Sequence, residues 1–121
     1  MKRNEEYWKH AQLKSLADAL LQGKTNEEAA AEFGYKADWT RKKLVWIKQD
    51  YPELYALIKT KPYRALQRVI YTGCTLEEAL KTFNISEKTF WTFMNERILK
   101  SNPYAYIRIR SHVHNQKIQN R

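Results

Sequence analysis

The chain has 121 residues, a hydrophobic content of 43% and a formal net charge of +9 at pH 7. This length accommodates one or two small domains, and no apolar run approaches the roughly 20 residues of a membrane-spanning helix. A single cysteine excludes an internal disulfide, and one cysteine with three histidines excludes an ordinary structural zinc site. The charged amino terminus lacks the apolar stretch of a secretory signal. We therefore expect a cytoplasmic protein with no membrane, metal or cofactor partner.

The positive charge is concentrated towards the carboxy-terminal end. Residues 97–121 hold six Lys/Arg and no Asp/Glu, whereas residues 1–50 hold ten Lys/Arg against eight Asp/Glu. A basic excess of this size favours a polyanionic partner, which means nucleic acid or an anionic membrane surface. The alternative interpretation is a charge that only keeps the protein in solution.

The first half of the chain begins with two predicted helices. Apolar residues recur at helical spacing over residues 5–22, and Gly23 suits the left-handed conformation that follows a last helical turn. Thr25 and Glu28 have the spacing of a capping box, in which each side chain accepts a hydrogen bond from the other residue's backbone. A second helix should therefore begin here and run to about residue 33.

A third and a fourth helix are predicted after a turn at Gly34. Residues 37–47 supply the third helix, and Pro52 starts a short fourth because proline is well tolerated in the first turn. Strand signals are weak throughout. Residues 104–110 alternate between apolar and polar side chains, but their match to residues 53–59 favours a helix.

The second half of the chain repeats this pattern at a spacing of about 50 residues. The matching pairs are Gly23/Gly73, Thr25/Thr75, Glu27/Glu77, Glu28/Glu78, Ala29/Ala79 and Phe33/Phe83, followed by Pro52/Pro103 and Ile58/Ile109. A period this long indicates that a supersecondary unit was duplicated.

The third helices of the two halves can be aligned in two ways. Without a gap, Thr40 falls where Phe90 is expected to be buried. Removing one residue from the turn instead places Trp39 opposite Phe90. Lys43 falls opposite an apolar residue in both alignments, so the exposed face of the first of these helices stays open.

Residues 73–94 resemble a helix-turn-helix of the homeodomain-like class, in the form found in bacterial resolvases and transposases. The residues that carry the resemblance are Ala79, Leu80, Phe83, Asn84, Ile85, Ser86, Thr89, Phe90, Phe93 and Met94. They match the family's small-apolar pair, tight turn, helix cap and buried recognition-helix face. The first copy of the motif, residues 23–44, fits the turn better and the third helix less well.

The resemblance and the repeat together predict the fold and its divisions. We expect an all-α fold of two tandem helix-turn-helix units, each of three to four helices, packed in one compact chain. The first unit covers residues 1–60 and the second covers residues 61–110. Residues 111–121 form a polar, basic tail that we expect to be flexible.

The third helix of such a motif can present its exposed side to the DNA major groove, where base edges lie within reach. In the first unit the predicted DNA-contacting residues are Lys36, Asp38, Arg41 and Lys42. In the second unit they are Ser86, Lys88, Trp91, Thr92 and Asn95, with Arg108 and Arg110 as phosphate contacts. Arginine suits guanine and asparagine suits adenine. The alternative for these residues is an ordinary solvated helix face.

Trp91 allows two interpretations. If Phe90 and Phe93 face the core, the Trp91 ring points outward or towards the other unit. An exposed indole would stack on sugar or bases or join an interface, and coverage by the other unit is the alternative.

The sequence therefore predicts a sequence-specific double-stranded DNA-binding protein, a small bacterial, phage or plasmid transcriptional regulator with two recognition helices. One alternative is a nucleoprotein assembly factor, such as a phage packaging or partition subunit, which would associate with itself. Another is the DNA-binding arm of a recombinase or transposase. The sequence has no Gly-rich phosphate loop, nucleophile elbow or acidic cluster, so no enzyme is predicted.

Overall fold

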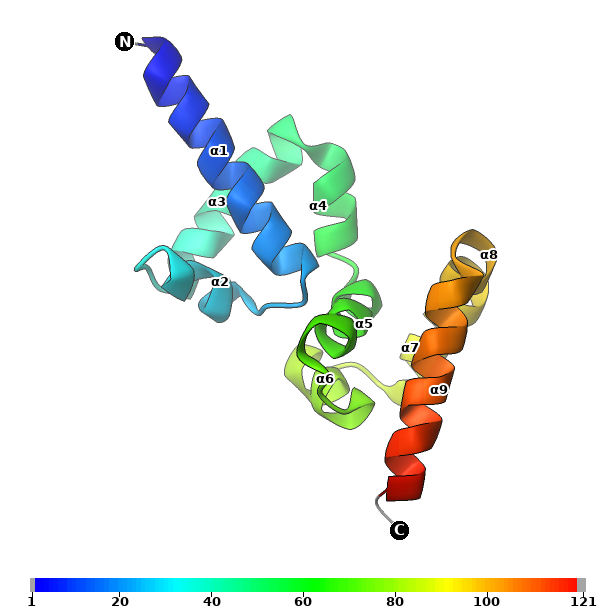
Figure 1. Cartoon of the computed structure of the whole chain (residues 1–121). Coiled ribbons are helices and arrows are strands. Elements are labelled where there is room, and N and C mark those ends of the chain that lie inside the picture. The colour runs from blue at the N-terminus through cyan, green and yellow to red at the C-terminus, as the bar shows by residue number, and fades with distance from the viewer. Residues whose placement is uncertain (1, 120–121) are drawn as a thin grey trace. The chain divides into compact units, whose positions relative to one another are not determined.

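Helices dominate the structure, a computed structural model that describes the backbone of residues 2–119 and the side chains of residues 8–118 (Figure 1). No strand occurs in these residues, so the predicted all-α class is confirmed. Among residues 2–119, none of the helices combines the length and the apolar character that a membrane crossing requires.

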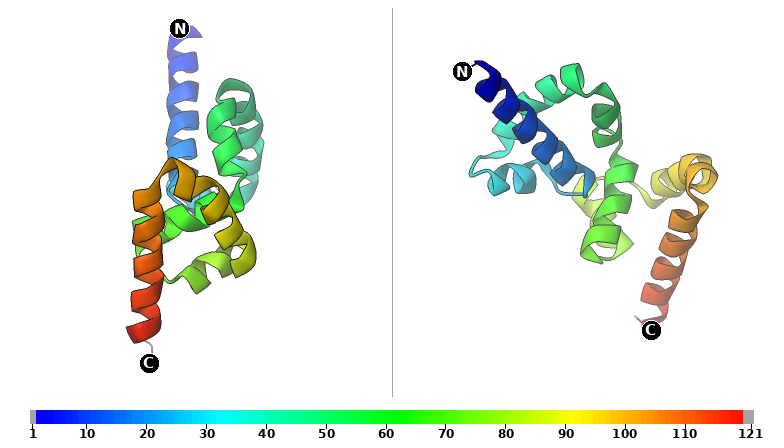
Figure 2. Two further views of the ribbon diagram at one scale, coloured as in Figure 1. Left: turned by 90° about the vertical axis from the view of Figure 1, so that its right-hand side faces the viewer. Right: turned by 45° about the horizontal axis from the view of Figure 1, so that its top comes forward.

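The chain divides into two units, Met1–Thr60 and Lys61–Arg121, each with its own hydrophobic core. Unit 1 contains α1 (Lys2–Leu21), α2 (Asn26–Glu32), α3 (Ala37–Asp50) and α4 (Pro52–Ile58). Unit 2 contains α5 (Lys61–Thr72), α6 (Leu76–Phe83), α7 (Glu87–Phe93), the π-helical turn η1 (Met94–Ile98), α8 (Leu99–Ser101) and α9 (Pro103–Gln119). Figure 2 shows the helices of each unit from two further sides.

The core of unit 1 is built on one face of α1. Leu13, Leu16 and Leu20 are fully buried, at the helical spacing that the sequence shows. They share a cluster with Ile47 of α3 and Ile58 of α4, which are also buried. Full burial of one such side chain contributes about 1.5–3 kcal/mol, so these contacts hold α3 in a defined orientation.

The core of unit 2 includes a contribution from α9. Leu66 of α5, Phe90 of α7 and Met94 of η1 are buried in one cluster. Ile109 and Val113 of α9 belong to the same cluster, with exposed fractions of 1% and 9%. The last helix is therefore part of the folded unit rather than an appendage to it.

The same capping chemistry starts the second helix of each unit. The Thr25 hydroxyl accepts a hydrogen bond from Glu28 N at 3.1 Å, and the Glu28 carboxylate accepts one from Thr25 N at 2.9 Å, which completes the predicted capping box. In unit 2 the Thr75 hydroxyl accepts the matching bond from Glu78 N at 3.1 Å. These bonds satisfy backbone donors that a helix start leaves without intrahelical partners.

The turn before the third helix is also shared. Gly34 has φ +80°, and Asn84 takes the left-handed conformation at φ 54°. Past this residue, Tyr35 N donates to Ala30 O at 3.0 Å in unit 1, and the equivalent bond joins α6 to the turn in unit 2. Asparagine replaces glycine here because it tolerates left-handed backbone better than most residues.

The structure decides between the two alignments of the third helices. Thr40 and Phe90 are both 0% exposed, and the residues that precede the helices, Lys36 and Ser86, are also 50 positions apart. The ungapped alignment is therefore right at the start of these helices, and the alternative that places Trp39 opposite Phe90 is wrong.

Equivalent residues of the two units are 50 positions apart at the start of the third helix and 51 positions apart at its end. The change occurs at η1. Ile47 and Ile98 are both buried, and each accepts a 2.7 Å hydrogen bond from the residue that ends its helix, Tyr51 or Asn102. All of these pairs are 51 apart. A single-residue insertion in an α-helix is accommodated as a π turn, so η1 absorbs the extra residue and restores the register of the core.

The predicted flexible tail from residue 111 is wrong for the residues that the structure describes. Helix α9 continues through this segment to Gln119. Val113 is buried. The backbone carbonyl of Cys74 accepts a hydrogen bond from Gln116 Nε2 at 3.3 Å, and His112 Nε2 lies at hydrogen-bonding distance from the same carbonyl, also 3.3 Å. The composition of this segment predicted a polar, flexible carboxy-terminal end. In the structure, the buried Val113 side chain and the two contacts to Cys74 hold the segment against unit 2. Residues 120–121 lie outside the described part.

Arg64 of α5 is the one charged side chain that is buried within residues 8–118. Its guanidinium carbon lies 4.9 Å from the centre of the Phe83 ring. Burial lowers the pKa of Arg64 from its ordinary value to about 10, so the group stays protonated at neutral pH. This charge is held inside unit 2 and does not add to its outer basic surface.

Candidate nucleic-acid interface

In unit 1, the predicted recognition helix α3 is anchored by a buried hydroxyl. Thr40 is fully buried and donates a hydrogen bond to the backbone carbonyl of Asn26 at 2.8 Å. Because Asn26 begins α2, this bond joins the two helices of the motif directly. The sequence marked Thr40 only as a poor match to Phe90, and an unusual hydroxyl at a core position was the signal for such a bond.

Aromatic side chains brace the turn between α2 and α3. Tyr35 and Trp39 stack with ring centres 4.8 Å apart and planes 14° apart, and Phe33 lies 5.0 Å from Trp39 on centres. Tyr35 is 51% exposed, and Lys43 Nζ lies 5.9 Å from the Trp39 ring centre. This stack orders the residues at the start of the predicted contact surface.

All four residues predicted to contact DNA in unit 1 are exposed and lie at the start of α3. They are Lys36, Asp38, Arg41 and Lys42. Arg41 forms an ion pair with Asp38 one turn earlier. Exposed pairs of this kind contribute about 0–1 kcal/mol, so a stronger acceptor can replace the Asp38 carboxylate at little cost. The surface therefore offers two lysines and one arginine that can exchange its Asp38 partner for another acceptor.

In unit 2, the predicted contact residues at the start of α7 have mixed roles. The Ser86 hydroxyl caps the helix, since it accepts from Thr89 N at 3.1 Å and donates to Thr89 Oγ1 at 2.9 Å. Lys88 and Thr92 are exposed. The serine is thus occupied by the helix start, and the free face of α7 carries one lysine and one threonine of the predicted set.

Helix α9 contacts the other two predicted residues of unit 2, Trp91 of α7 and Asn95 of η1. The Tyr106 hydroxyl donates to Asn95 Oδ1 at 2.7 Å. Trp91 is partly buried, with the Tyr106 ring at 6.3 Å between centres and the Arg110 guanidinium 5.1 Å from its ring centre. This partial cover of Trp91 comes from the last helix of its own unit, which runs back over α7 (Figures 1 and 2), and neither expectation included it.

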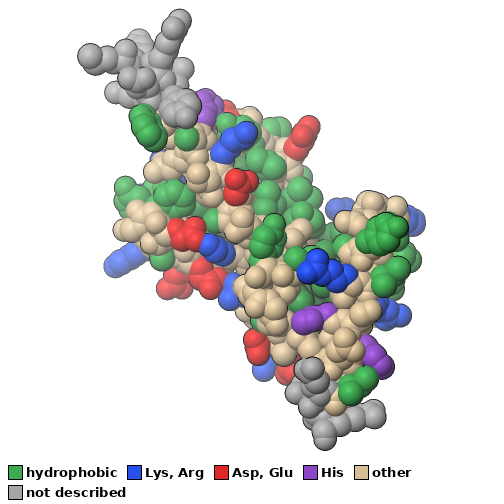
Figure 3. All heavy atoms as spheres, viewed as in Figure 1, with side chains coloured by type: hydrophobic (Ala, Val, Ile, Leu, Met, Phe, Trp, Pro, Cys, Tyr) green, Lys and Arg blue, Asp and Glu red, His purple; other side chains and the backbone are tan. Residues whose placement is uncertain are grey.

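The exposed surface of α9 is basic. Arg108 and Arg110 are exposed, and Arg110 remains accessible to solvent although it lies on the Trp91 and Tyr106 rings. Helix α9 contains no Asp or Glu, and Figure 3 shows basic and histidine side chains interspersed with apolar and other ones on its visible face. The two arginines expected to contact phosphates therefore lie on an ordered helix.

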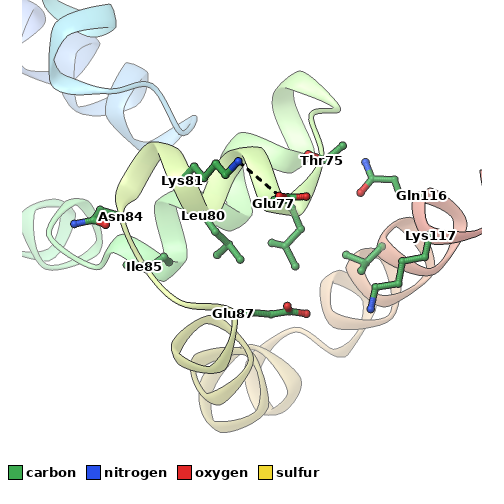
Figure 4. Close-up of a pocket in the computed structure, with 11 residues that line it drawn as sticks. Thr75, Glu77, Leu80, Lys81, Asn84, Ile85, Glu87, Gln116 and Lys117 are labelled. Atoms are coloured by element: carbon green, nitrogen blue, oxygen red, sulfur yellow. Dashed lines mark ion pairs between the residues drawn. The ribbon is translucent and has the colours of Figure 1, made fainter. Parts of the chain in front are cut away.

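Unit 2 also has a groove of about 490 Å³ that the sequence did not predict. Leu76, Leu80 and Val113 form much of its apolar floor. Glu87 and Lys117 point towards one another across it, and a Glu77–Lys81 ion pair of 3.6 Å lies at its rim (Figure 4). The walls come from α6, α7 and α9, so the groove follows from the docking of α9.

No side-chain cluster at these surfaces suits metal chemistry. Within the described residues there is no group of three or more His, Cys, Asp and Glu that could hold a metal ion. What the surfaces offer is hydrogen-bond donors, positive charge and exposed aromatic rings.

Comparison of the chain with protein-family models, with curated proteins and with solved structures gives no match.

Proposed function

We propose that this protein binds double-stranded DNA in a sequence-specific way, as a small transcriptional regulator, and that α3 of unit 1 is its recognition helix. The observation that carries the proposal is the exposed amino-terminal face of α3, where Lys36, Arg41 and Lys42 project from a helix that is fixed by its own core. The protein acts in this proposal as a binding protein and not as an enzyme.

Three physical features support α3 in this role. A helix fits the major groove of B-DNA, and side chains on its exposed face reach base edges. The Thr40–Asn26 hydrogen bond and the Tyr35–Trp39 stack keep the start of α3 ordered before any ligand arrives. Arg41 has the forked geometry for guanine, while lysines suit phosphate oxygens as point charges.

The two units contribute unequally in this proposal. The matching face of unit 2 is partly occupied, because Trp91 of α7 and Asn95 of η1 contact α9. We therefore expect an asymmetric DNA site, and not two identical half-sites contacted in the same way by the two units. The bound sequence should accordingly lack palindromic symmetry.

Selection of bound sequences from random duplex DNA tests the proposal, with the selection repeated at two salt concentrations. A recovered, non-palindromic motif that survives the higher salt supports a sequence-specific regulator. Binding without any motif, lost steeply as salt rises, is the behaviour of phosphate contacts alone and would contradict it.

A specific observation favours a second candidate, a nucleoprotein assembly factor that associates with itself. Trp8, Val45 and Trp46 in unit 1 are exposed by 69%, 57% and 42%, and large apolar side chains at a surface often mark interfaces. The mass of the protein in solution, measured with and without scrambled duplex, separates the candidates. A monomer that ignores scrambled DNA favours the regulator, and concentration-dependent oligomers on any sequence favour assembly.

A further inference from the structure

We infer that α9, and not α7, is the helix through which unit 2 contacts DNA, an inference that rests on the proposed DNA binding. The outer face of α9 carries Tyr104, Arg108, Ser111 and Asn115, all exposed. Their spacing of four, three and four residues places them on one stripe of the helix. We call these four residues the α9 stripe.

The chemistry of the α9 stripe suits a DNA groove. An arginine pairs bidentately with guanine, an asparagine with adenine, and a serine hydroxyl bonds to either. Ile107, which is 59% exposed beside the stripe, suits contact with a thymine methyl group. A helix of 17 residues is about 25 Å long, which is ample to lie along a groove of about 12 Å width.

The opposite face of α9 fixes the stripe in place. Ile109 and Val113 are buried in the core of unit 2. His112 and Gln116 contact the Cys74 carbonyl at the start of α6. Since the inner face is held at several points along the helix, the outer face is presented as an ordered surface, and little conformational entropy remains to be lost on binding.

Charge selects the occupant of this surface. Helix α9 has no acidic residue, and it carries the exposed Arg110 and Lys117 in addition to Arg108 of the stripe. Two copies of such a helix would repel each other, while a polyanion would be attracted. DNA is therefore a better occupant than a second copy of the chain. The equivalent helix of unit 1, α4, has only seven residues, so this surface belongs to unit 2 alone.

One substitution on each helix tests the inference in the full-length protein. Ser111→Glu places a carboxylate in the middle of the α9 stripe, and Thr92→Glu places one on the exposed face of α7 as a matched control. With the duplex recovered by selection as probe, we expect Ser111→Glu to weaken binding by about tenfold and to lower the salt slope by about one. Thr92→Glu should stay within about twofold of the unchanged protein.

A second substitution separates charge from damage to the fold. Ser111→Lys should strengthen binding, whereas a substitution that merely disturbs α9 would weaken binding whatever its sign. Loss of affinity for Thr92→Glu together with normal affinity for Ser111→Glu would overturn the inference in favour of α7. Normal affinity for both glutamate variants would also overturn it, and would leave α9 as a surface for a different partner.

The test also distinguishes this inference from the proposed function. If the unchanged protein binds no duplex, the proposed function itself fails. If the protein binds and Lys42→Glu abolishes binding while Ser111→Glu does not change it, DNA binding through α3 stands and the role of α9 is rejected.

Discussion

At the scale of single residues, the two units place side chains of different polarity at one equivalent buried position. Thr40 and Phe90 are both fully buried at the equivalent point of the third helix. Phe90 contributes apolar area, while Thr40 contributes a hydrogen bond to the Asn26 carbonyl and leaves the apolar contacts to Phe33 and Trp39. A buried hydroxyl is tolerated in a core because it is hydrogen-bonded.

Thr40→Val should destabilise unit 1 by about 1 kcal/mol, because it keeps the side-chain volume and removes the hydrogen bond to Asn26. Urea unfolding monitored by circular dichroism measures the change. Thr92→Val is the matched control on an exposed site, and we expect it to have almost no effect. Equal stability of the Thr40→Val and unchanged proteins would show that the bond contributes nothing.

Arg41→Ala should cost about 1–3 kcal/mol of binding free energy and relax the preference at one base pair, if Arg41 reads a base. Arg41→Lys is the informative companion, because lysine keeps the charge but loses the bidentate fork. Binding measured against the selected duplex and its single-base variants gives both quantities. A lysine variant with full affinity and unchanged preference would place Arg41 on a phosphate.

At the scale of elements, the π turn η1 reconciles the repeat with the core. The extra residue lies between Met94 and Ile98, which are both buried. A regular α-helix with the same insertion would turn Ile98 about 100° away from the core. The wider turn keeps both side chains inside the core. Asn102, which precedes α9, then has a backbone conformation close to that of Tyr51, which precedes α4 in unit 1.

Deletion of Glu96, an exposed residue of η1, should convert the π turn into a regular α-helix with little change in stability, within about 1 kcal/mol. Deletion of Lys42 from α3 is the control. Since α3 has no surplus residue, this deletion should turn Ile47 out of the core and cost about 2–5 kcal/mol. Unfolding in urea compares the two. A Glu96 deletion as damaging as the Lys42 deletion would contradict the insertion.

At the scale of the whole molecule, the two units share a scaffold and differ in charge. Residues 1–60 hold eleven Lys/Arg against nine Asp/Glu, and residues 61–121 hold eleven against four. The surplus positive charge thus belongs to unit 2, which also has the long α9. In the proposed function, unit 1 supplies base reading through α3 and unit 2 supplies most of the electrostatic attraction.

Each unit expressed alone should fold, because each has a separate core. We expect residues 1–60 and residues 61–121 each to unfold cooperatively on heating, as measured by circular dichroism. Binding of residues 61–121 to scrambled duplex should fall more steeply with salt than that of residues 1–60, since the slope follows the number of phosphates neutralised. Similar slopes for both fragments would contradict this division.

The scaffold was predictable where local chemistry decides it. Thr25 with Glu28, the left-handed positions at Gly34 and Asn84, and the apolar spacing of α1 act over a few residues, so they can be recognised without tertiary contacts. Lys36, Arg41 and Lys42, which the sequence listed as DNA contacts, are exposed in the structure. Their contact with DNA stays a prediction.

Long-range contacts decided the rest. The sequence left two alignments of the third helix open, and only burial of Thr40 and Phe90 distinguished them. It also listed Trp91 and Asn95 among the DNA contacts, because nothing near them in the chain announces that α9 folds back over α7. The cover depends on Tyr106 and Arg110, which lie more than ten residues away in sequence.

By itself, the sequence determined that this protein is helical, that its scaffold is repeated, and that its positive charge accumulates near the carboxy terminus. Helix caps, turns and apolar periodicity are local, and duplication makes them visible twice. Only the tertiary structure decided which surfaces remain open. The course of α9 depends on Ile109 and Val113 finding a core built by residues far earlier in the chain, and that docking covers α7 while it presents the α9 stripe.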